Sequence, residues 1–258
     1  MRTRFEPVPT VNAEPMSHDS GGDSPAAGPV TAATERIVAT AATLDDADLT
    51  APSLCPGWTR AHVLTHVARN ADALSNLLAW ARTGRENPMY PSNEARAADI
   101  EAGAGRSAAE IVDDLRASAD RFVRAVMEMP DDGWERQVRR GPAGTGDPLP
   151  GRRVLWLRLR ELEVHHVDLA TGYGPADWPA AFVGRALDET VRAFGRREDV
   201  PAVTLEIDGD GVEHLGAEAP VTVGGAPADV LAWLIGRSDG AGLRVQPPGR
   251  LPALPPWL

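Results

Sequence analysis

Apolar side chains recur every three or four positions in long segments of the chain, which is the spacing of one face of an α-helix. In the segment 59–85, Pro56 and Gly57 precede the first turn and Thr59 can cap it. Its apolar positions are Val63, Val67, Ala71, Leu74, Leu77, Leu78 and Ala81. Further helices are expected at about 31–44, 107–129 and 152–171. Four amphipathic helices joined by long connections predict an antiparallel bundle.

Two details of this bundle follow from the same pattern. The inward positions of the segment 107–129 are Ile111, Leu115, Phe122, Val126 and Met127. Residues 141–151, GPAGTGDPLPG, are rich in Gly and Pro and are expected to form a loop.

The pattern changes after about residue 175. A helix at about 179–196 is followed by the β-branched runs VTLEI and APVTV, which are typical of strands, and by a helix at about 226–236. The chain is therefore predicted to have an α+β fold, with a helical bundle over 30–175 and a smaller α/β domain over 176–258. Residues 1–29 have too few large apolar groups to form a core and are expected to be a disordered tail, within which Met16 is an alternative start.

Composition and charge narrow the class of protein. The 258 residues carry a net charge of -11, which argues against a general binder of nucleic acid or anionic membranes. No apolar run approaches the roughly 20 residues that span a bilayer, and the N-terminus lacks the apolar core of a signal peptide. We therefore expect a cytoplasmic protein that binds neither nucleic acid nor membranes. Separately, we expect a monomer or weak oligomer whose partners are small molecules.

Residue usage also limits the chemistry that the chain can perform. All 26 basic residues are Arg, which excludes Schiff-base chemistry and a lysine-dependent phosphate loop. Cys55 is the only cysteine, so neither an intrachain disulfide nor a site with several thiolates can form. We expect Cys55 to be a small buried apolar side chain rather than a nucleophile. Thiol chemistry would then need a thiol from outside.

The most informative residues are histidines and carboxylates on two of the helices. A helical wheel of the segment 152–171 places one group of polar residues within about 80 degrees, on the face that carries the apolar residues. This group consists of Arg158, Glu161, His165 and Asp168, and its apolar neighbours are Val154, Leu157 and Leu169. Glu163 points the opposite way. Glu161 and His165 are four residues apart and can reach one metal ion, and His66, at the edge of the apolar stripe of 59–85, is the natural third ligand.

An alternative without a metal stays open. Glu161 can pair with Arg158 or Arg160, while His165 makes a hydrogen bond in the core. His62 and His166 are expected to lie outside the ligand set, next to it or at the surface.

Three segments together resemble the mycothiol-dependent maleylpyruvate isomerase family. They are LCPGWTRAHVLTHVARNADAL, RELEVHHVDLATGY, and the closing LAWLIGRSDGAGL with LPPWL. The resemblance covers about residues 30–258 and implies a DinB-like four-helix bundle followed by a small α/β domain. It also implies a divalent metal, usually zinc, bound by His66, Glu161 and His165, and a functionally important arginine that falls at Arg237.

This resemblance implies a function. A thiolate of mycothiol would add to the cis double bond of maleylpyruvate, and rotation and loss of the thiolate would give fumarylpyruvate. Arg237 is the candidate for holding a substrate carboxylate, whereas Arg152 is expected to be a solvated helix start. The alternatives are a mycothiol S-transferase that releases a conjugate, and a metal-binding protein without catalysis.

Overall fold

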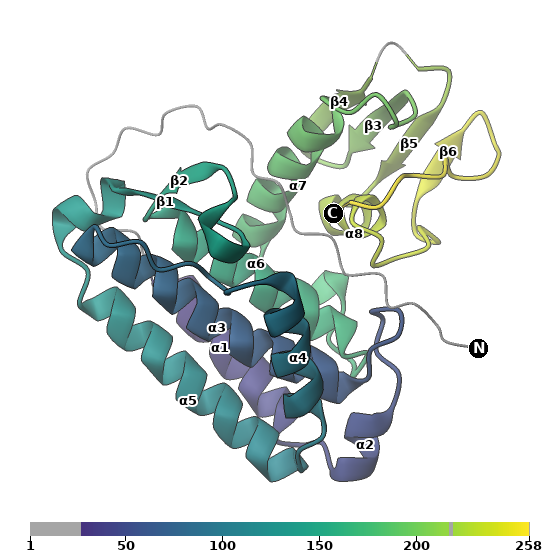
Figure 1. Cartoon of the computed structure of the whole chain (residues 1–258). Coiled ribbons are helices and arrows are strands. Elements are labelled where there is room, and N and C mark those ends of the chain that lie inside the picture. The colour runs from purple at the N-terminus through teal and green to yellow at the C-terminus, as the bar shows by residue number, and fades with distance from the viewer. Residues whose placement is uncertain (1–26, 217–218, 258) are drawn as a thin grey trace. The chain divides into compact units, whose positions relative to one another are not determined.

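The computed structural model describes residues 27–216 and 219–257 of the chain (Figure 1). Within these, the chain divides into two compact units, one up to Thr171 and one from Gly172 to Trp257. The predicted disordered tail at 1–29 and the alternative start at Met16 lie outside the described residues, apart from 27–29, where α1 begins. Among the described residues, every helix is too short or too polar to cross a membrane.

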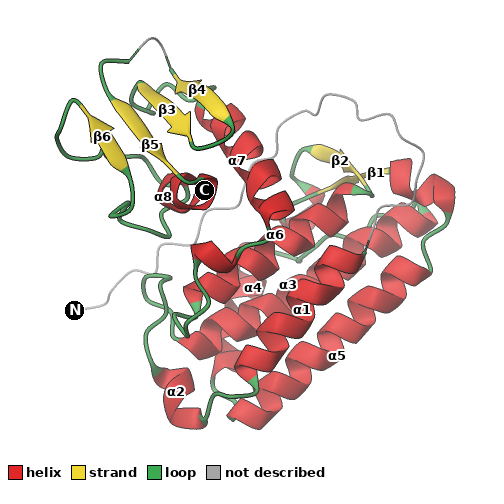
Figure 2. Ribbon diagram, turned by 180° about the vertical axis from the view of Figure 1, so that it is seen from behind, coloured by secondary structure: helices red, strands yellow, loops and turns green. Residues whose placement is uncertain are grey.

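The first unit is a helical bundle, as the apolar pattern predicts. Its helices are α1 (Gly28–Ala41), α2 (Asp46–Thr50), α3 (Arg60–Thr83), α4 (Asn93–Ala104), α5 (Ala108–Met127) and α6 (Arg153–Asp168). The long helices α1, α3, α5 and α6 run side by side (Figures 1 and 2), with α3 packed against both α5 and α6, and α1 against α6. All seven predicted apolar positions of α3 are buried in the core.

The helix α3 shows how the local sequence sets its own ends. Thr59 is the N-cap residue, and its backbone N–H donates to Nδ1 of His62 at 3.3 Å. At the other end Gly84 adopts the left-handed conformation (φ +71°), which a residue without a Cβ reaches at no steric cost. These signals stand in the sequence beside the apolar stripe, so the helix forms where it is predicted.

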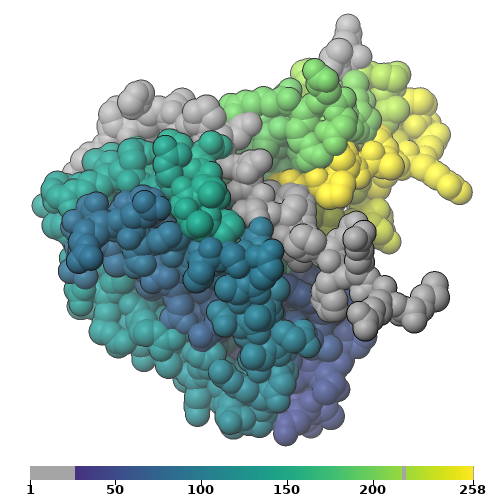
Figure 3. Space-filling model, viewed as in Figure 1, coloured from purple at the N-terminus to yellow at the C-terminus, as the bar shows by residue number. Residues whose placement is uncertain are grey.

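Two helices, α2 and α4, are absent from the sequence prediction. Only Ile100 and Gly103 of α4 are buried, so α4 has no apolar stripe to reveal it. In the space-filling view (Figure 3), α4 lies at the surface of the first unit. It packs closely on α3 at Gly103, where a Cβ would come within 2.3 Å of the Thr65 side chain.

Two expectations about which residues face the core are wrong. Met127 is 80% exposed, because α5 ends there and Met129 beyond the helix packs into the core instead. Glu163 was expected to point away from the buried face of its helix, yet it is only 1% exposed and forms an ion pair with Arg36 of α1. The reason is that α6 has packed neighbours on both sides, α3 and α1. A wheel of α6 alone does not show the second neighbour.

The segment predicted as the loop 141–151 includes the end of a short hairpin. Strand β1 (Gln137–Arg139) pairs with β2 (Pro148–Pro150) in antiparallel register, with Val138 opposite Leu149. Both of these side chains are buried in the core of the bundle. Short 3-10 turns precede β1 (η1, Asp131–Glu135) and lie within its loop (η2, Pro142–Gly144).

The second unit combines helices with one four-stranded sheet. Its elements are η3 (Pro175–Asp177), α7 (Ala180–Phe194), β3 (Val203–Ile207), β4 (Gly211–Leu215), β5 (Thr222–Gly225), α8 (Pro227–Leu234) and β6 (Arg244–Gln246). The strand order is β4-β3-β5-β6; β3 and β5 are parallel and the outer pairings are antiparallel. The predicted strands are the two central ones. The edge strands β4 and β6 lack a buried alternating pattern, so the sequence does not reveal them.

Candidate metal centre

Three side chains from two helices of the first unit converge on one point. His66 comes from α3, and Glu161 and His165 come from successive turns of α6, which packs against α3. Nε2 of His66 lies 3.0 Å from Oε2 of Glu161, and Nε2 of His165 lies 3.4 Å from the same oxygen. One donor atom from each of the three residues lies within 4.8 Å of the others. These are the residues that the sequence proposes as metal ligands, and the fold brings them together.

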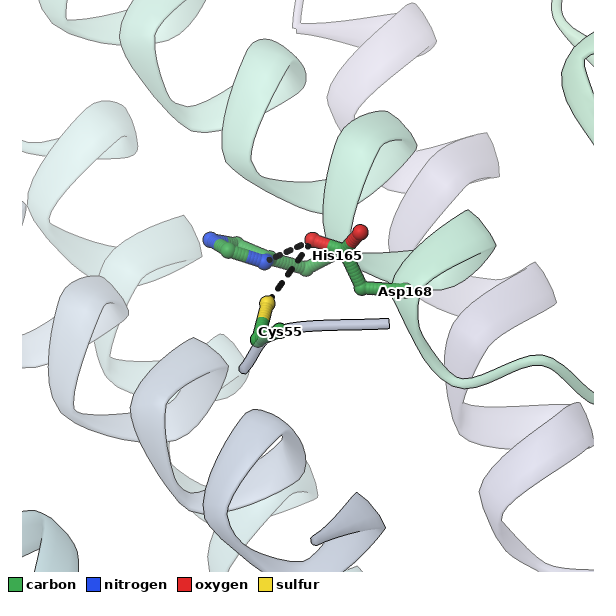
Figure 4. Close-up of side chains that lie close together, drawn as sticks. All are labelled: Cys55, His165 and Asp168. Carbon is green, nitrogen blue, oxygen red and sulfur yellow. Dashed lines mark hydrogen bonds and ion pairs between the residues drawn. The ribbon is translucent and has the colours of Figure 1, made fainter. Parts of the chain in front are cut away.

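His165 is held from behind by a buried carboxylate. Its Nδ1 faces the carboxylate of Asp168 (Figure 4), at 2.8 Å from Oδ2. Asp168 has no exposed surface. The same carboxylate oxygen accepts a hydrogen bond from Sγ of Cys55 at 3.2 Å. The backbone N–H of Leu54 donates to the carbonyl of Asp168 at 2.9 Å, which fixes the loop before α3 to the end of α6. Nδ1 of His165 is thereby engaged and its Nε2 is left facing Glu161.

The role of Cys55 differs from the expectation of a buried apolar side chain. Cys55 is only half-buried, and its thiol is a hydrogen-bond donor to the carboxylate that orients His165. Cys55, His165 and Asp168 form a second group whose donor atoms are close enough for one ion. The two groups share His165, but they use opposite sides of its ring.

His66 is surrounded by groups that the sequence does not place near it. Nη2 of Arg96, on α4, lies 3.2 Å from Nδ1 of His66, and the Arg96 guanidinium stands over the ring of Tyr90 at 5.8 Å. The ring of Trp58 lies 5.5 Å from that of His66. Because α4 carries no helical apolar stripe, no sequence signal identifies Arg96 as a neighbour of the site.

The electrostatics of the three residues depend on burial and on their mutual hydrogen bonds. Burial lowers the pKa of His66 to about 4, against the opposing hydrogen bond to Glu161, so His66 is neutral near pH 7. Burial by itself raises the pKa of Glu161, but hydrogen bonds to His165 and His66 hold it well below 4.5. Burial likewise lowers the pKa of His165, but hydrogen bonds to Asp168, Cys55 and Glu161 raise it well above 6.5.

These directions describe a site that suits a cation. A charged His165 ring lies between two carboxylates, Glu161 and Asp168, and a neutral His66 lies beside Glu161. A divalent metal can take the place of the proton on Nε2 of His165, because two imidazoles and one carboxylate are common ligands of zinc and similar ions. In the arrangement described, Nδ1 of His66 accepts from Arg96, so coordination through Nε2 requires the proton to move to Nδ1 and Arg96 to release it.

The other polar residues considered from the sequence have contacts elsewhere. His62 contacts Thr59 and Glu101, and His166 is buried with its Nε2 2.7 Å from the hydroxyl of Thr40. Arg158 donates to the carbonyl of Val67 and to Oδ1 of Asn70. Arg152 pairs with Glu135 at the start of α6.

Arg237 belongs to the second unit, directly after α8. Its backbone N–H donates to the carbonyl of Ala232 at 2.7 Å, and its Nη1 donates to the carbonyl of Ile235 at 2.9 Å. These contacts satisfy carbonyl groups at the end of the helix, as a C-terminal cation does. A functional role for Arg237 stays a prediction.

Comparison with protein families accounts for both units. A family model described as the mycothiol maleylpyruvate isomerase N-terminal domain matches residues 30–170, and one described as the C-terminal domain of the same family matches residues 177–256. The chain belongs to the mycothiol maleylpyruvate isomerase family. The predicted α+β fold, a helical bundle followed by a smaller domain with strands, is confirmed.

Solved structures place the chain within the same family of enzymes. The crystal structure of a mycothiol-dependent maleylpyruvate isomerase is 29% identical to the chain, with a TM-score of 0.81. A histidine-to-alanine variant of such an isomerase is 28% identical, with a TM-score of 0.82. Each comparison covers 90% of this chain and 95% of the matched chain. A comparison with curated proteins returned no match.

Proposed function

We propose that this member of the mycothiol maleylpyruvate isomerase family is a metal-assisted, mycothiol-dependent isomerase of maleylpyruvate or a related unsaturated oxo acid. The observation that carries the proposal is the convergence of His66, Glu161 and His165 in the bundle of this family. The solved relatives are mycothiol-dependent maleylpyruvate isomerases, and each comparison covers 95% of the relative's chain. The identity of the oxo acid is part of the proposal, because neither the fold nor the family determines which substrate is used.

We propose His66, Glu161 and His165 as the ligands of one divalent ion, with zinc as the first candidate. A zinc ion held there would supply Lewis-acid stabilisation of a thiolate at neutral pH. The chain's own residues prepare the donors. Burial keeps His66 neutral, and Asp168 holds the ring of His165 with Nε2 toward Glu161. Three protein ligands leave room for a thiol, as in catalytic rather than structural zinc sites.

The isomerisation needs a nucleophile that adds and then leaves. A thiolate sulfur forms a bond to one carbon of the cis double bond, and the electron pair of that double bond moves to the adjacent carbonyl to give an enolate. The former double bond is now single and rotates. The enolate electrons then return, the carbon–sulfur bond breaks, and the trans isomer and the thiolate are released. Cys55 is the only cysteine in the chain, and its thiol is hydrogen-bonded to Asp168, so the nucleophile is proposed to be mycothiol.

Arg237 is proposed to bind a carboxylate of the substrate or the enolate oxygen. Support comes from the family resemblance of the segment LAWLIGR, while the contact with Ile235 also fits a helix cap. Arg237→Ala separates the two roles. A fall in turnover of about a hundredfold at an unchanged melting temperature is expected for a substrate contact. A lower melting temperature with unchanged turnover of the folded enzyme identifies a cap.

One experiment tests the metal set and the reaction together. Purified wild type is expected to hold one divalent ion per chain, and His66→Ala to lose it. The matched control is His62→Ala, one turn earlier on α3, which is expected to retain the ion. Equal metal content in wild type and His66→Ala contradicts the assignment.

The reaction is then followed with mycothiol and maleylpyruvate by ultraviolet absorbance and mass spectrometry. Formation of the trans isomer without net consumption of mycothiol supports the isomerase. A stable thiol adduct identifies an S-transferase instead. No change in either reactant refutes both enzymatic functions for this substrate.

A further inference from the structure

One buried arginine outside the proposed ligand set has a guanidinium nitrogen without a hydrogen-bond partner among the described residues. Arg140 directly follows β1, and its side chain is on the inward side of the strand because Val138, two residues earlier, is buried in the core. Arg140 is 8% exposed, and its Nη2 is buried with no hydrogen-bond partner among the residues that the structure describes. Fully buried arginines are rare unless they are paired. This guanidinium therefore suits an anion that comes from outside the described chain.

The surroundings of Arg140 connect it to the candidate metal centre. Burial, together with the nearby charges of Arg160 and Arg153, lowers the pKa of Arg140 to about 9, while the carboxylates of Glu161 and Asp147 oppose this shift. Glu161 is one of the three proposed ligands. The charge of one proposed ligand therefore acts on Arg140, together with the charge of Asp147.

The backbone around Arg140 is fixed by close contacts. Gly141 has φ +125°, and a Cβ on Gly146 would lie 1.2 Å from the carbonyl oxygen of Arg140, so only glycine fits there. Nη1 of Arg139 donates to the carbonyl of Gly146 at 3.2 Å, which closes the loop. A closed loop presents Arg140 in one position, and such pre-organisation favours ligand binding.

The same loop is tied to the surroundings of His66. The backbone N–H of Ala143 donates to the carbonyl of Tyr90 at 2.9 Å. The ring of Tyr90 in turn lies beneath the guanidinium of Arg96, and Arg96 contacts His66. The loop that carries Arg140 is thus connected to His66 through Tyr90 and Arg96.

We propose that Arg140 is an anion-binding residue that receives a carboxylate of the substrate beside the metal centre. The identity of the acid rests on the proposed function, whereas the need for an anion rests on the buried, unpartnered Nη2. A carboxylate suits a single guanidinium, because the two groups can form two parallel hydrogen bonds. An unpaired buried arginine is also costly to the folded protein, so the ligand-free protein is expected to gain stability when the charge is removed.

The test uses the full chain loaded with zinc, and succinate as an unreactive dicarboxylate probe. Succinate binding is measured by calorimetry for wild type, Arg140→Met and Arg140→Lys. The matched control is Arg116→Met, which removes an exposed arginine of α5 and its ion pair with the exposed Asp113. We expect the Kd to rise at least about tenfold in Arg140→Met, less in Arg140→Lys, and little in Arg116→Met.

The outcomes separate this proposal from the proposed function. Loss of succinate affinity in Arg140→Met at unchanged zinc content, with a melting temperature equal to or above that of wild type, supports the anion site even if maleylpyruvate is not isomerised. Equal affinity in wild type and Arg140→Met overturns it, as does the absence of saturable binding by wild type at millimolar succinate. A lower melting temperature with unchanged affinity gives Arg140 a structural role and also overturns it.

Discussion

Asp168 is expected to control how tightly the proposed centre holds a metal. Its Oδ2 lies 2.8 Å from Nδ1 of His165 and accepts from the thiol of Cys55, and the residue is fully buried. A carboxylate behind a metal-binding histidine fixes the orientation and tautomer of the ring. Asp168→Ala removes this acceptor and leaves the Nδ1–H of a buried ring without its partner.

The size of the effect follows from these contacts. Leaving one buried donor without its acceptor costs about 1–3 kcal/mol. Loss of such a carboxylate typically weakens metal binding by roughly 10- to 100-fold, or about 1.4–2.7 kcal/mol. Asp168→Asn keeps an oxygen that can accept from His165 but loses the charge, so its effect is expected at the lower end, about tenfold. The order of zinc affinity is therefore wild type, Asp168→Asn, Asp168→Ala.

The assay is competition for zinc with a chromophoric chelator, beside a melting curve that confirms folding. The control is Asp114→Asn on α5, which weakens ion pairs with Arg69 and Arg106 rather than contacts with the candidate ligands. Its zinc affinity is expected to match wild type. If folded Asp168→Ala and Asp168→Asn both bind zinc as tightly as wild type, Asp168 does not support a metal ligand.

Three further predictions concern the residues around the site and the core. Cys55→Ala is expected to keep thiol-dependent turnover within severalfold of wild type, because it removes a weak donor to Asp168 and a contact with His165 but no proposed ligand. Activity without any added thiol in wild type would contradict the external nucleophile. Arg36→Met is expected to lower the free energy of unfolding by about 3 kcal/mol, because it removes the charged partner of the buried Glu163. Urea unfolding of the double variant Arg36→Met/Glu163→Leu should show that most of this free energy is recovered. Burial raises the pKa of Tyr90 to about 12. The stability linked to its neutral form is therefore present below pH 10 and is lost as the pH rises toward 12. A difference titration against Tyr90→Phe should show no phenolate from Tyr90 near pH 10.

The four bundle helices could be predicted from the sequence because each carries its own signal. That signal is a stripe of apolar residues, and in α3 it is accompanied by the N-cap residue Thr59 and by the left-handed Gly84 at the other end. The closeness of Glu161 and His165 is equally local, because residues four apart on a helix emerge on adjacent turns. His66 could be chosen as the third candidate ligand because it lies at the edge of the apolar face of its own helix.

Other parts of the site depend on contacts between distant segments. Cys55 meets Asp168 across 113 positions of the chain, and Arg96 reaches His66 from a helix whose pattern is not amphipathic enough to be seen. The inward position of Arg140 likewise requires the hairpin to be paired and packed on the bundle.

The misassigned face of Glu163 shows the physical reason for this division. A helical wheel gives the direction of each side chain relative to its own axis, and that direction is a property of the local sequence. Whether water or another helix lies in that direction depends on how many neighbours pack around the helix. For α6 the neighbours are α3 on the side of Glu161 and His165 and α1 on the side of Glu163. The sequence thus determined the four long helices of the bundle and which of their residues are candidate ligands. The packing of α3 on α6 brought those three residues together, and the packing of α1, α4 and the hairpin decided the charges that surround them.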